Sequence, residues 1–126
     1  MKKILIVDDD KDLRVVMRTV LEKQYMVQEA GSAKEGLAAA VKFSPDLVLL
    51  DVMMETLSAG FDLARDLKTG KKTRQVKILM ITNVDKAMKI DYQSETGDKS
   101  WLPVDDYLVK PVDPKALLAK VQKILA

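Results

Sequence analysis

Two short apolar runs in this 126-residue chain are each followed directly by carboxylates. Ile4–Val7 precedes the three aspartates at positions 8–10, and Leu47–Leu50 precedes Asp51. A short apolar run between turn signals is typical of a strand buried on both faces of a parallel sheet. Because the carboxyl ends of parallel strands meet at one edge, these carboxylates would lie close together, which is unfavourable without a cation between them. A hard divalent cation with oxygen ligands, Mg²⁺ first, is the natural candidate.

Two further predicted strands end in polar residues that suit phosphoryl transfer. The apolar run 76–81 precedes Thr82, and the short run 107–109 precedes Lys110. A carboxylate such as Asp51 can act as the nucleophile and form an aspartyl phosphate. Mg²⁺ would neutralise phosphoryl oxygens, while Thr82 offers a hydroxyl donor and Lys110 a point charge.

A single polar residue at a strand end is more often a turn residue, a helix cap or a surface group than part of an active site. We assign Asp10 to such a role, as the cap of the helix that follows it. The other polar residues follow several predicted strands at one edge, so we interpret them together as a functional set. The set comprises Asp8, Asp9, Asp51, Thr82 and Lys110.

Predicted strands and helices alternate along the whole chain. We expect strands at 4–7, 25–29, 47–50, 76–81 and 107–109, each followed by a helix, the fourth of these helices beginning near Asp85. Such an alternation predicts a parallel sheet with helices on both faces. We therefore expect one α/β domain over residues 1–126, a doubly wound parallel sheet with no segment left for an output domain.

Helical spacing also predicts the buried faces and the ends of two helices. Ser32 and Glu35 match a capping box at the start of the second helix, and Pro45 closes it. The side chains expected to face the core are Leu13, Val16, Met17, Val20 and Leu21 in the first helix, and Leu37, Ala38, Val41 and Phe43 in the second.

The composition excludes several kinds of chemistry. The chain has no Cys and no His, so thiol catalysis, zinc–thiolate sites and a histidine base or phosphohistidine of its own are excluded. The net charge of +2 does not call for nucleic acid or an acidic membrane surface. No apolar run approaches the length of a membrane span, and the N-terminal run is too short for a signal peptide, so we expect a cytoplasmic location.

The chain resembles the receiver domain of two-component response regulators. The resemblance is carried by residues 4–10, 46–54, 81–82 and 106–111, and it extends over nearly the whole chain. It implies a flavodoxin-like (βα)5 sheet with strand order 2-1-3-4-5, an order for which such a receiver is one of the standard examples. It also implies that the Lys110–Pro111 peptide is cis.

The resemblance assigns a role to each site residue. Asp51 would be the phosphoacceptor. Asp9 and Asp51 would ligate Mg²⁺ together with the backbone carbonyl of Met53, and Asp8 would help mainly through water. Thr82 and Lys110 would contact the phosphoryl group.

A switch is implied as well, in which the hydroxyl of Thr82 moves toward the phosphoryl group and Tyr107 turns inward. The alternative for Tyr107 is an edge aromatic with its hydroxyl in water. The surface of the fourth helix, fifth strand and fifth helix would carry the signal to a protein target.

On this basis we expect a single-domain response regulator, a switch rather than an enzyme. Its partners would be a sensor histidine kinase or phosphotransfer protein and a downstream protein target, with no direct nucleic acid and no membrane. A phosphorylation-dependent dimer stays open. The alternatives are a receiver-fold interaction module that does not depend on phosphate, and a receiver excised from a larger regulator or hybrid kinase.

The chain departs from the family pattern in three places. Glu55 stands where a Pro is common, and it could reach the metal or face solvent; we favour solvent. Asn83 follows Thr82 where the family usually has a small residue, which could alter phosphoryl loss. The interval from Thr82 to Lys110 is long, with the excess at 94–104, where Trp101 would cap a helix end or contact a partner.

Overall fold

The structure, a computed structural model, describes residues 1–51, 57–83 and 104–126. Its strands are β1 (Lys3–Val7), β2 (Met26–Ala30), β3 (Leu47–Asp51), β4 (Lys77–Asn83) and β5 (Asp106–Lys110). The described helices are α1 (Lys11–Leu21), α2 (Ala33–Phe43), α3 (Leu57–Thr69) and α5 (Pro114–Leu125). The predictions about Met53, Glu55, Trp101 and the helix near Asp85 lie outside the described residues.

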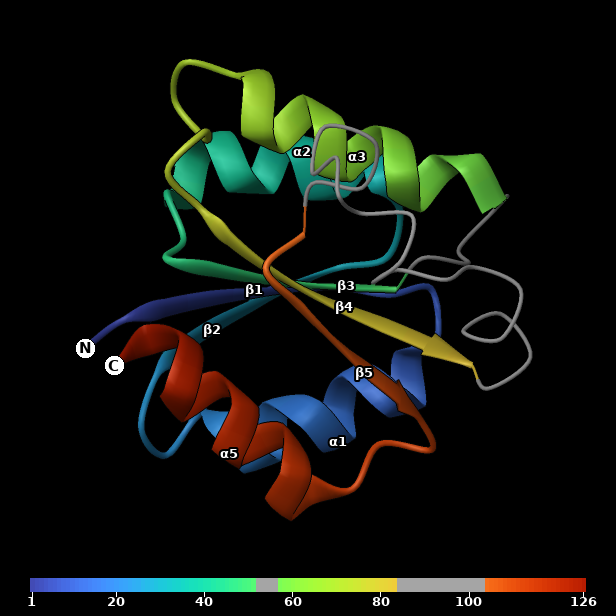
Figure 1. Ribbon diagram of the computed structural model, residues 1–126, viewed down its shortest axis with the longest axis vertical. Helices are drawn as coiled ribbons and strands as arrows, with labels where there is room; N and C mark the ends of the chain where they lie inside the picture. The colour runs from blue at the N-terminus through green and yellow to red at the C-terminus, as the bar shows by residue number, and fades with distance from the viewer. Residues whose placement is uncertain (52–56, 84–103) are drawn as a thin grey trace.

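All strand pairs are parallel, and the sheet order is β2-β1-β3-β4-β5. Helices α2 and α3 cover one face of the sheet, and α1 and α5 cover the other (Figure 1). The predicted doubly wound α/β sheet with strand order 2-1-3-4-5 is therefore confirmed. Because every strand runs in the same direction, all the carboxyl ends lie at one edge of the sheet.

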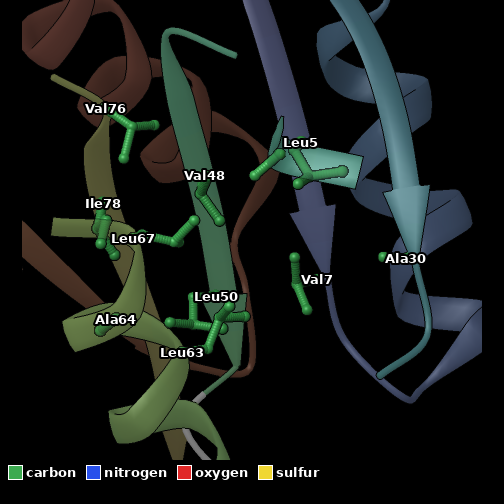
Figure 2. Packing of buried hydrophobic residues seen from close by; sticks show 11 residues of the cluster. Leu5, Val7, Ala30, Val48, Leu50, Leu63, Ala64, Leu67, Val76 and Ile78 are labelled. Carbon is green, nitrogen blue, oxygen red and sulfur yellow. The ribbon is translucent and has the colours of Figure 1, made fainter. Parts of the chain in front are cut away.

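Alternate residues of the central strands pack into two separate cores. On one face, Leu5 and Val7 of β1 and Val48 and Leu50 of β3 belong to one cluster with α3, and Figure 2 shows Leu63 beside Leu50 and Leu67 beside Val48. On the other face, a second cluster joins β1, β3 and β4 to α1 and α5; its sheet residues include Ile4, Ile6, Leu47, Leu49, Leu79 and Ile81. Burying a side chain of this size contributes roughly 1.5–3 kcal/mol. The two-sided burial explains why these strands read as continuous apolar runs.

Short polar residues begin helices α1 and α2. Asp10 accepts a hydrogen bond from the Leu13 backbone N–H at 3.2 Å, which confirms its predicted capping role. Ser32 accepts from the backbone N–H of Glu35 at 3.1 Å, but the Glu35 carboxylate accepts from Gly31 rather than from Ser32. The predicted capping box is therefore half correct, since its return bond reaches one residue further back.

The predicted core face was wrong at three positions. Val16 and Val41 are 47% and 40% exposed, and Ala38 is exposed as well. In α2 the buried positions are Gly36 and Ala40, because this helix approaches the sheet very closely. A Cβ added at Gly36 would lie only 2.9 Å from both methyl carbons of Val7. The side of α2 that contacts the sheet therefore carries its smallest residues, and Ala38 and Val41 lie on the side that faces outward.

Within the described ranges, no helix has the length and apolar character needed to cross a membrane. The strands begin and end within about a residue or two of their predicted positions, which is the usual scatter of such boundaries. The Lys110–Pro111 peptide is cis, as the resemblance implies.

Candidate functional site

Three carboxylates converge at the carboxyl edge of the sheet. Asp8 and Asp9 follow β1, and Asp51 is the last residue of β3. The two strands are neighbours with Val7 opposite Leu50, so their ends lie abreast. One carboxylate oxygen from each of the three aspartates lies within 4.8 Å of the others. Asp8 and Asp51 are 1% and 3% exposed, whereas Asp9 is exposed.

The main chain and side chain of Asp8 are held from several directions. Its backbone N–H donates to Ala30 O at 3.1 Å, and its carbonyl accepts from Arg14 Nη1 at 2.5 Å. Its Oδ1 accepts from the backbone N–H of Asp10 at 2.9 Å. Its Oδ2 is buried and has no hydrogen-bond partner in the part of the chain that the structure describes. A buried oxygen of this kind is costly unless a cation or donor reaches it.

Burial raises the pKa of the Asp8 carboxyl from 3.8 to about 6. Burial is the largest contribution to this net pKa; the hydrogen bond from Asp10 and the charge of Lys110 lower it, and the negative charges of Asp51 and Asp9 raise it. The folded protein therefore holds Asp8 in an environment that disfavours its charged form. A bound cation would reverse that preference.

Lys110 brings a positive charge to the carboxylates from the end of β5. Its Nζ lies 3.4 Å from Asp51 Oδ2 and 3.8 Å from Asp8 Oδ2. In the described ranges this one ammonium does not balance three carboxylates, and it leaves the buried Asp8 oxygen without a hydrogen bond. The donor set consists of carboxylate oxygens, which suit a hard divalent cation such as Mg²⁺. The residues therefore fit the metal that receiver domains generally bind.

Thr82 lies at the same edge, in the strand next to Asp51. It is fully buried, and its neighbour Ile81 pairs with Asp51 across β3 and β4. Asn83 follows as the last residue of β4 and pairs with Lys110. The sheet register thus brings Asp51, Thr82 and Lys110 to the same edge, with Thr82 one residue and Lys110 two residues beyond the level of Asp51.

Tyr107 lies three residues before Lys110 on β5 and is half-buried. By the alternation of side chains along a strand, it leaves the sheet on the face opposite to that of Lys110. Lys120 Nζ lies 5.7 Å from the centroid of its ring and 3.0 Å from Asp106 Oδ1. The Lys120 side chain of α5 therefore reaches the Tyr107 ring at the edge strand of the sheet.

Arg14 and Glu29 were not predicted from the sequence as residues of the site. Arg14 contacts both the Asp8 carbonyl and Glu29, with Arg14 Nε 3.0 Å from Glu29 Oε1. The signal was weak, because one Arg on the polar side of a helix and one Glu in a strand are ordinary surface residues. Their contact depends on where α1 crosses β2.

A cavity of about 400 Å³ lies at the opposite, amino edge of the sheet. Lys2, Lys77 and Asp46 are among its lining residues, together with apolar side chains such as Val76 and Leu125. None of the predicted site residues lines it. The site at the carboxyl edge is thus a cluster of charged groups and is separate from this cavity.

Comparisons with known proteins agree with this site. Residues 4–122 match the family model of the response regulator receiver domain. The chain is 33% identical to Protein PilH of Pseudomonas aeruginosa over 130 residues, covering 100% of this chain and 99% of PilH. It is also 33% identical to the DNA-binding dual master transcriptional regulator RpaA of Synechocystis, covering 99% of this chain but 49% of RpaA. The chain thus spans about half the length of that relative.

Solved structures show the same fold. The chemotaxis response regulator CheY4 of Vibrio cholerae superposes with a TM-score of 0.82 at 29% identity, covering 98% of each chain. A CheY-like response regulator receiver domain protein from Methanospirillum hungatei gives a TM-score of 0.80 at 29% identity, covering 99% of this chain and 94% of the other. The family match, the strand order and the acidic edge agree, and the chain belongs to the response regulator receiver domains of two-component systems.

Proposed function

We propose that this receiver is a Mg²⁺-dependent phosphorylation switch in which Asp51 accepts a phosphoryl group. The observation that carries the proposal is the approach of Lys110 Nζ to within 3.4 Å of Asp51 Oδ2, at an edge where three carboxylates lie within 4.8 Å of one another. Asp51 is the last residue of a fully buried strand, at the edge of the sheet where open parallel sheets bind their ligands.

The donor would be a phosphohistidine on a sensor histidine kinase or phosphotransfer protein in the cytoplasm, since this chain has no His. A carboxylate oxygen of Asp51 would form the new O–P bond as the P–N bond of the donor breaks, and the imidazole, already protonated on its other ring nitrogen, would leave as the neutral base. Asp9 and Asp51 would hold Mg²⁺ with the Met53 carbonyl, and Asp8 would assist through water. When bound, Mg²⁺ neutralises charge on the transferring phosphoryl oxygens.

Two further residues would receive the phosphoryl group at Asp51. The Lys110 ammonium would exchange part of its contact with the carboxylates for a phosphoryl oxygen, and the Thr82 hydroxyl would donate to another. Movement of Thr82 would then be coupled to Tyr107 on the next strand, and β5 and α5 would present the change to a protein target. In this proposal the protein acts as a signalling switch that assists its own phosphorylation, not as an enzyme with a separate substrate.

Two arrangements of the whole protein are compatible with this role. Its match to PilH along nearly the full length of both chains favours a single receiver domain over residues 1–126. Its match to about half of RpaA and of the phosphate regulon regulator PhoB supports the alternative, a receiver joined to an output domain. We favour the first, and dimerisation on phosphorylation would be one way for such a protein to signal.

Intact-mass measurement after incubation with acetyl phosphate tests the proposal, with and without Mg²⁺. We expect the wild-type protein to gain one phosphoryl group only when Mg²⁺ is present. Asp51→Asn should gain none, whereas the control Asp12→Asn, which neutralises an exposed acid in α1, should gain one like the wild type. No gain by the wild type, either from acetyl phosphate or from a phosphohistidine protein, would favour a receiver-fold interaction module that does not depend on phosphate.

A further inference from the structure

We propose that Arg14 is a positioning residue for the metal-binding carboxylates, acting through the main chain of Asp8. This inference rests on the Mg²⁺ site of the proposed function. Arg14 Nη1 donates to the carbonyl oxygen of Asp8 at 2.5 Å, across the turn that connects β1 to α1. The guanidinium is itself mostly buried, with 17% of its side chain exposed.

The contact matters because Asp8 has little else to hold its outer side. On the sheet side, its backbone N–H is bonded to Ala30 O. Among the described residues, the carboxylate is oriented by one hydrogen bond, from the Asp10 N–H to Oδ1, which leaves Oδ2 turned toward Lys110. Arg14 completes this set by fixing the carbonyl. Without it, the peptide plane between Asp8 and Asp9 could rotate, and both carboxylates of this turn would lose their positions.

The guanidinium is held on its other side by β2. Arg14 Nε lies 3.0 Å from Glu29 Oε1, and the second oxygen of Glu29 lies 2.9 Å from Arg18 Nη1. These bonds, with that of Arg18 first, lower the pKa of the Glu29 carboxyl below its usual value, so Glu29 stays charged near neutral pH. A fixed carboxylate that binds one face of a planar guanidinium leaves the other N–H groups aimed at a defined point.

Gly31 leaves room for this arrangement. A Cβ at that position would lie 3.3 Å from Arg14 Nη1, the same nitrogen that bonds Asp8. The absence of a side chain at Gly31 therefore leaves space for the guanidinium beside the end of β2. The Gly31 N–H is in turn bonded to Glu35 Oε2 at 3.1 Å, which holds the neighbouring turn in place.

Arg18 provides a matched control within the same network. It binds the same Glu29 with the same kind of bond, but among the described residues it makes no contact with Asp8. If Arg14 served only to link α1 to β2, removing either arginine would have the same effect on the metal site. If Arg14 acted only by its charge, removing it would strengthen Mg²⁺ binding, because a positive charge near the metal would be lost. A positioning role predicts the opposite sign.

The test is the dissociation constant of Mg²⁺ measured by isothermal titration calorimetry on the intact chain. We expect Arg14→Met to weaken Mg²⁺ binding about tenfold, as residues that orient metal ligands commonly do. Arg18→Met should stay within about twofold of the wild type, since it leaves the Asp8 carbonyl bonded. Arg14→Lys should recover part of the loss, because an ammonium can reach the carbonyl but cannot bind Glu29 at the same time.

The outcomes separate this inference from the function on which it rests. Equal or tighter Mg²⁺ binding by Arg14→Met, in a protein whose wild type binds Mg²⁺, would overturn the positioning role alone. A wild type that binds no Mg²⁺ would overturn both the metal site and this role. If Arg14→Met does not fold, the pair Arg14→Lys and Arg18→Lys replaces it, and a weaker affinity only in the first is then the expected result.

Discussion

Asp8 and Glu29 both accept hydrogen bonds from Arg14, but the folded protein disfavours the charged form of Asp8 and favours the charged form of Glu29. Glu29 places each carboxylate oxygen against a guanidinium, and its pKa is lowered. Asp8 is buried, has one oxygen without a hydrogen bond among the described residues, and has a pKa raised to about 6. The charge of Glu29 stabilises the folded protein, whereas the charge of Asp8 destabilises it. Residues whose charge opposes folding are those expected to be kept for binding.

The largest expected effect follows from neutralising Asp8. At pH 7, Asp8→Asn should raise the free energy of unfolding of the metal-free protein by about 2 kcal/mol, because a neutral amide removes the buried charge. The amide can still accept from Asp10 and can also donate toward Asp51. The same change should weaken Mg²⁺ binding at least about tenfold. Urea denaturation and calorimetric titration measure the two effects.

If the metal-free Asp8→Asn protein were less stable than the wild type, the charge of Asp8 would not destabilise the fold and the contrast with Glu29 would be wrong. The control is Asp12→Asn, which removes one exposed carboxylate from the same region and should change neither quantity appreciably. Together these variants separate the effect of burying a charge from the effect of net charge.

The stability of the metal-free protein should depend on pH through the titration of both Asp8 and Glu29. The folded pKa of Asp8 lies above its unfolded value, so the folded protein binds more protons between about pH 4 and 6. The metal-free protein should therefore become more stable, by about 1 kcal/mol, as the pH falls from 7 toward 5. Glu29 has a lowered folded pKa, so its stabilisation is present above its usual pKa of 4.5 and is lost as the pH falls through the lower value. The result is a stability maximum on the acid side of neutrality.

Denaturation curves at several pH values check this expectation. The rise between pH 7 and 5 should disappear in Asp8→Asn, and it should also disappear in the wild type at saturating Mg²⁺, because the bound metal keeps Asp8 ionised. If the rise in stability persists in Asp8→Asn, it must come from the titration of a group other than Asp8.

The smallest expected effect concerns Glu29 itself. Glu29→Gln should destabilise the protein by about 1 kcal/mol at neutral pH, since it loses two partly buried charge-assisted bonds. Glu22→Gln removes the weaker and more exposed bond to Arg18 and should cost less than about 0.5 kcal/mol. Chemical denaturation distinguishes the two, and equal losses would show that the β2 carboxylate has no special role in holding Arg14.

The fold and the clustering of Asp8, Asp51, Thr82 and Lys110 followed from sequence because both depend on one rule. Apolar runs become buried parallel strands, and parallel strands end at one edge. The outward position of Val41 could not be predicted in this way, since it depends on how closely Gly36 lets α2 approach β1. The Arg14–Glu29 pair was missed for a related reason, because a contact between a helix and a strand depends on their relative placement and leaves no periodic pattern.

The position of β5 at the edge of the sheet has a consequence for the charge balance of the site. In the described sheet β5 pairs with β4 alone, and each of its residues is half-buried, whereas every residue of β3 is buried. Strands with fewer buried contacts open more readily by local unfolding. An opening confined to β5 would carry Lys110 away from the aspartates while β1 and β3 stayed folded. Another cation would then be able to replace Lys110 beside the aspartates while the strands that carry those aspartates stay folded.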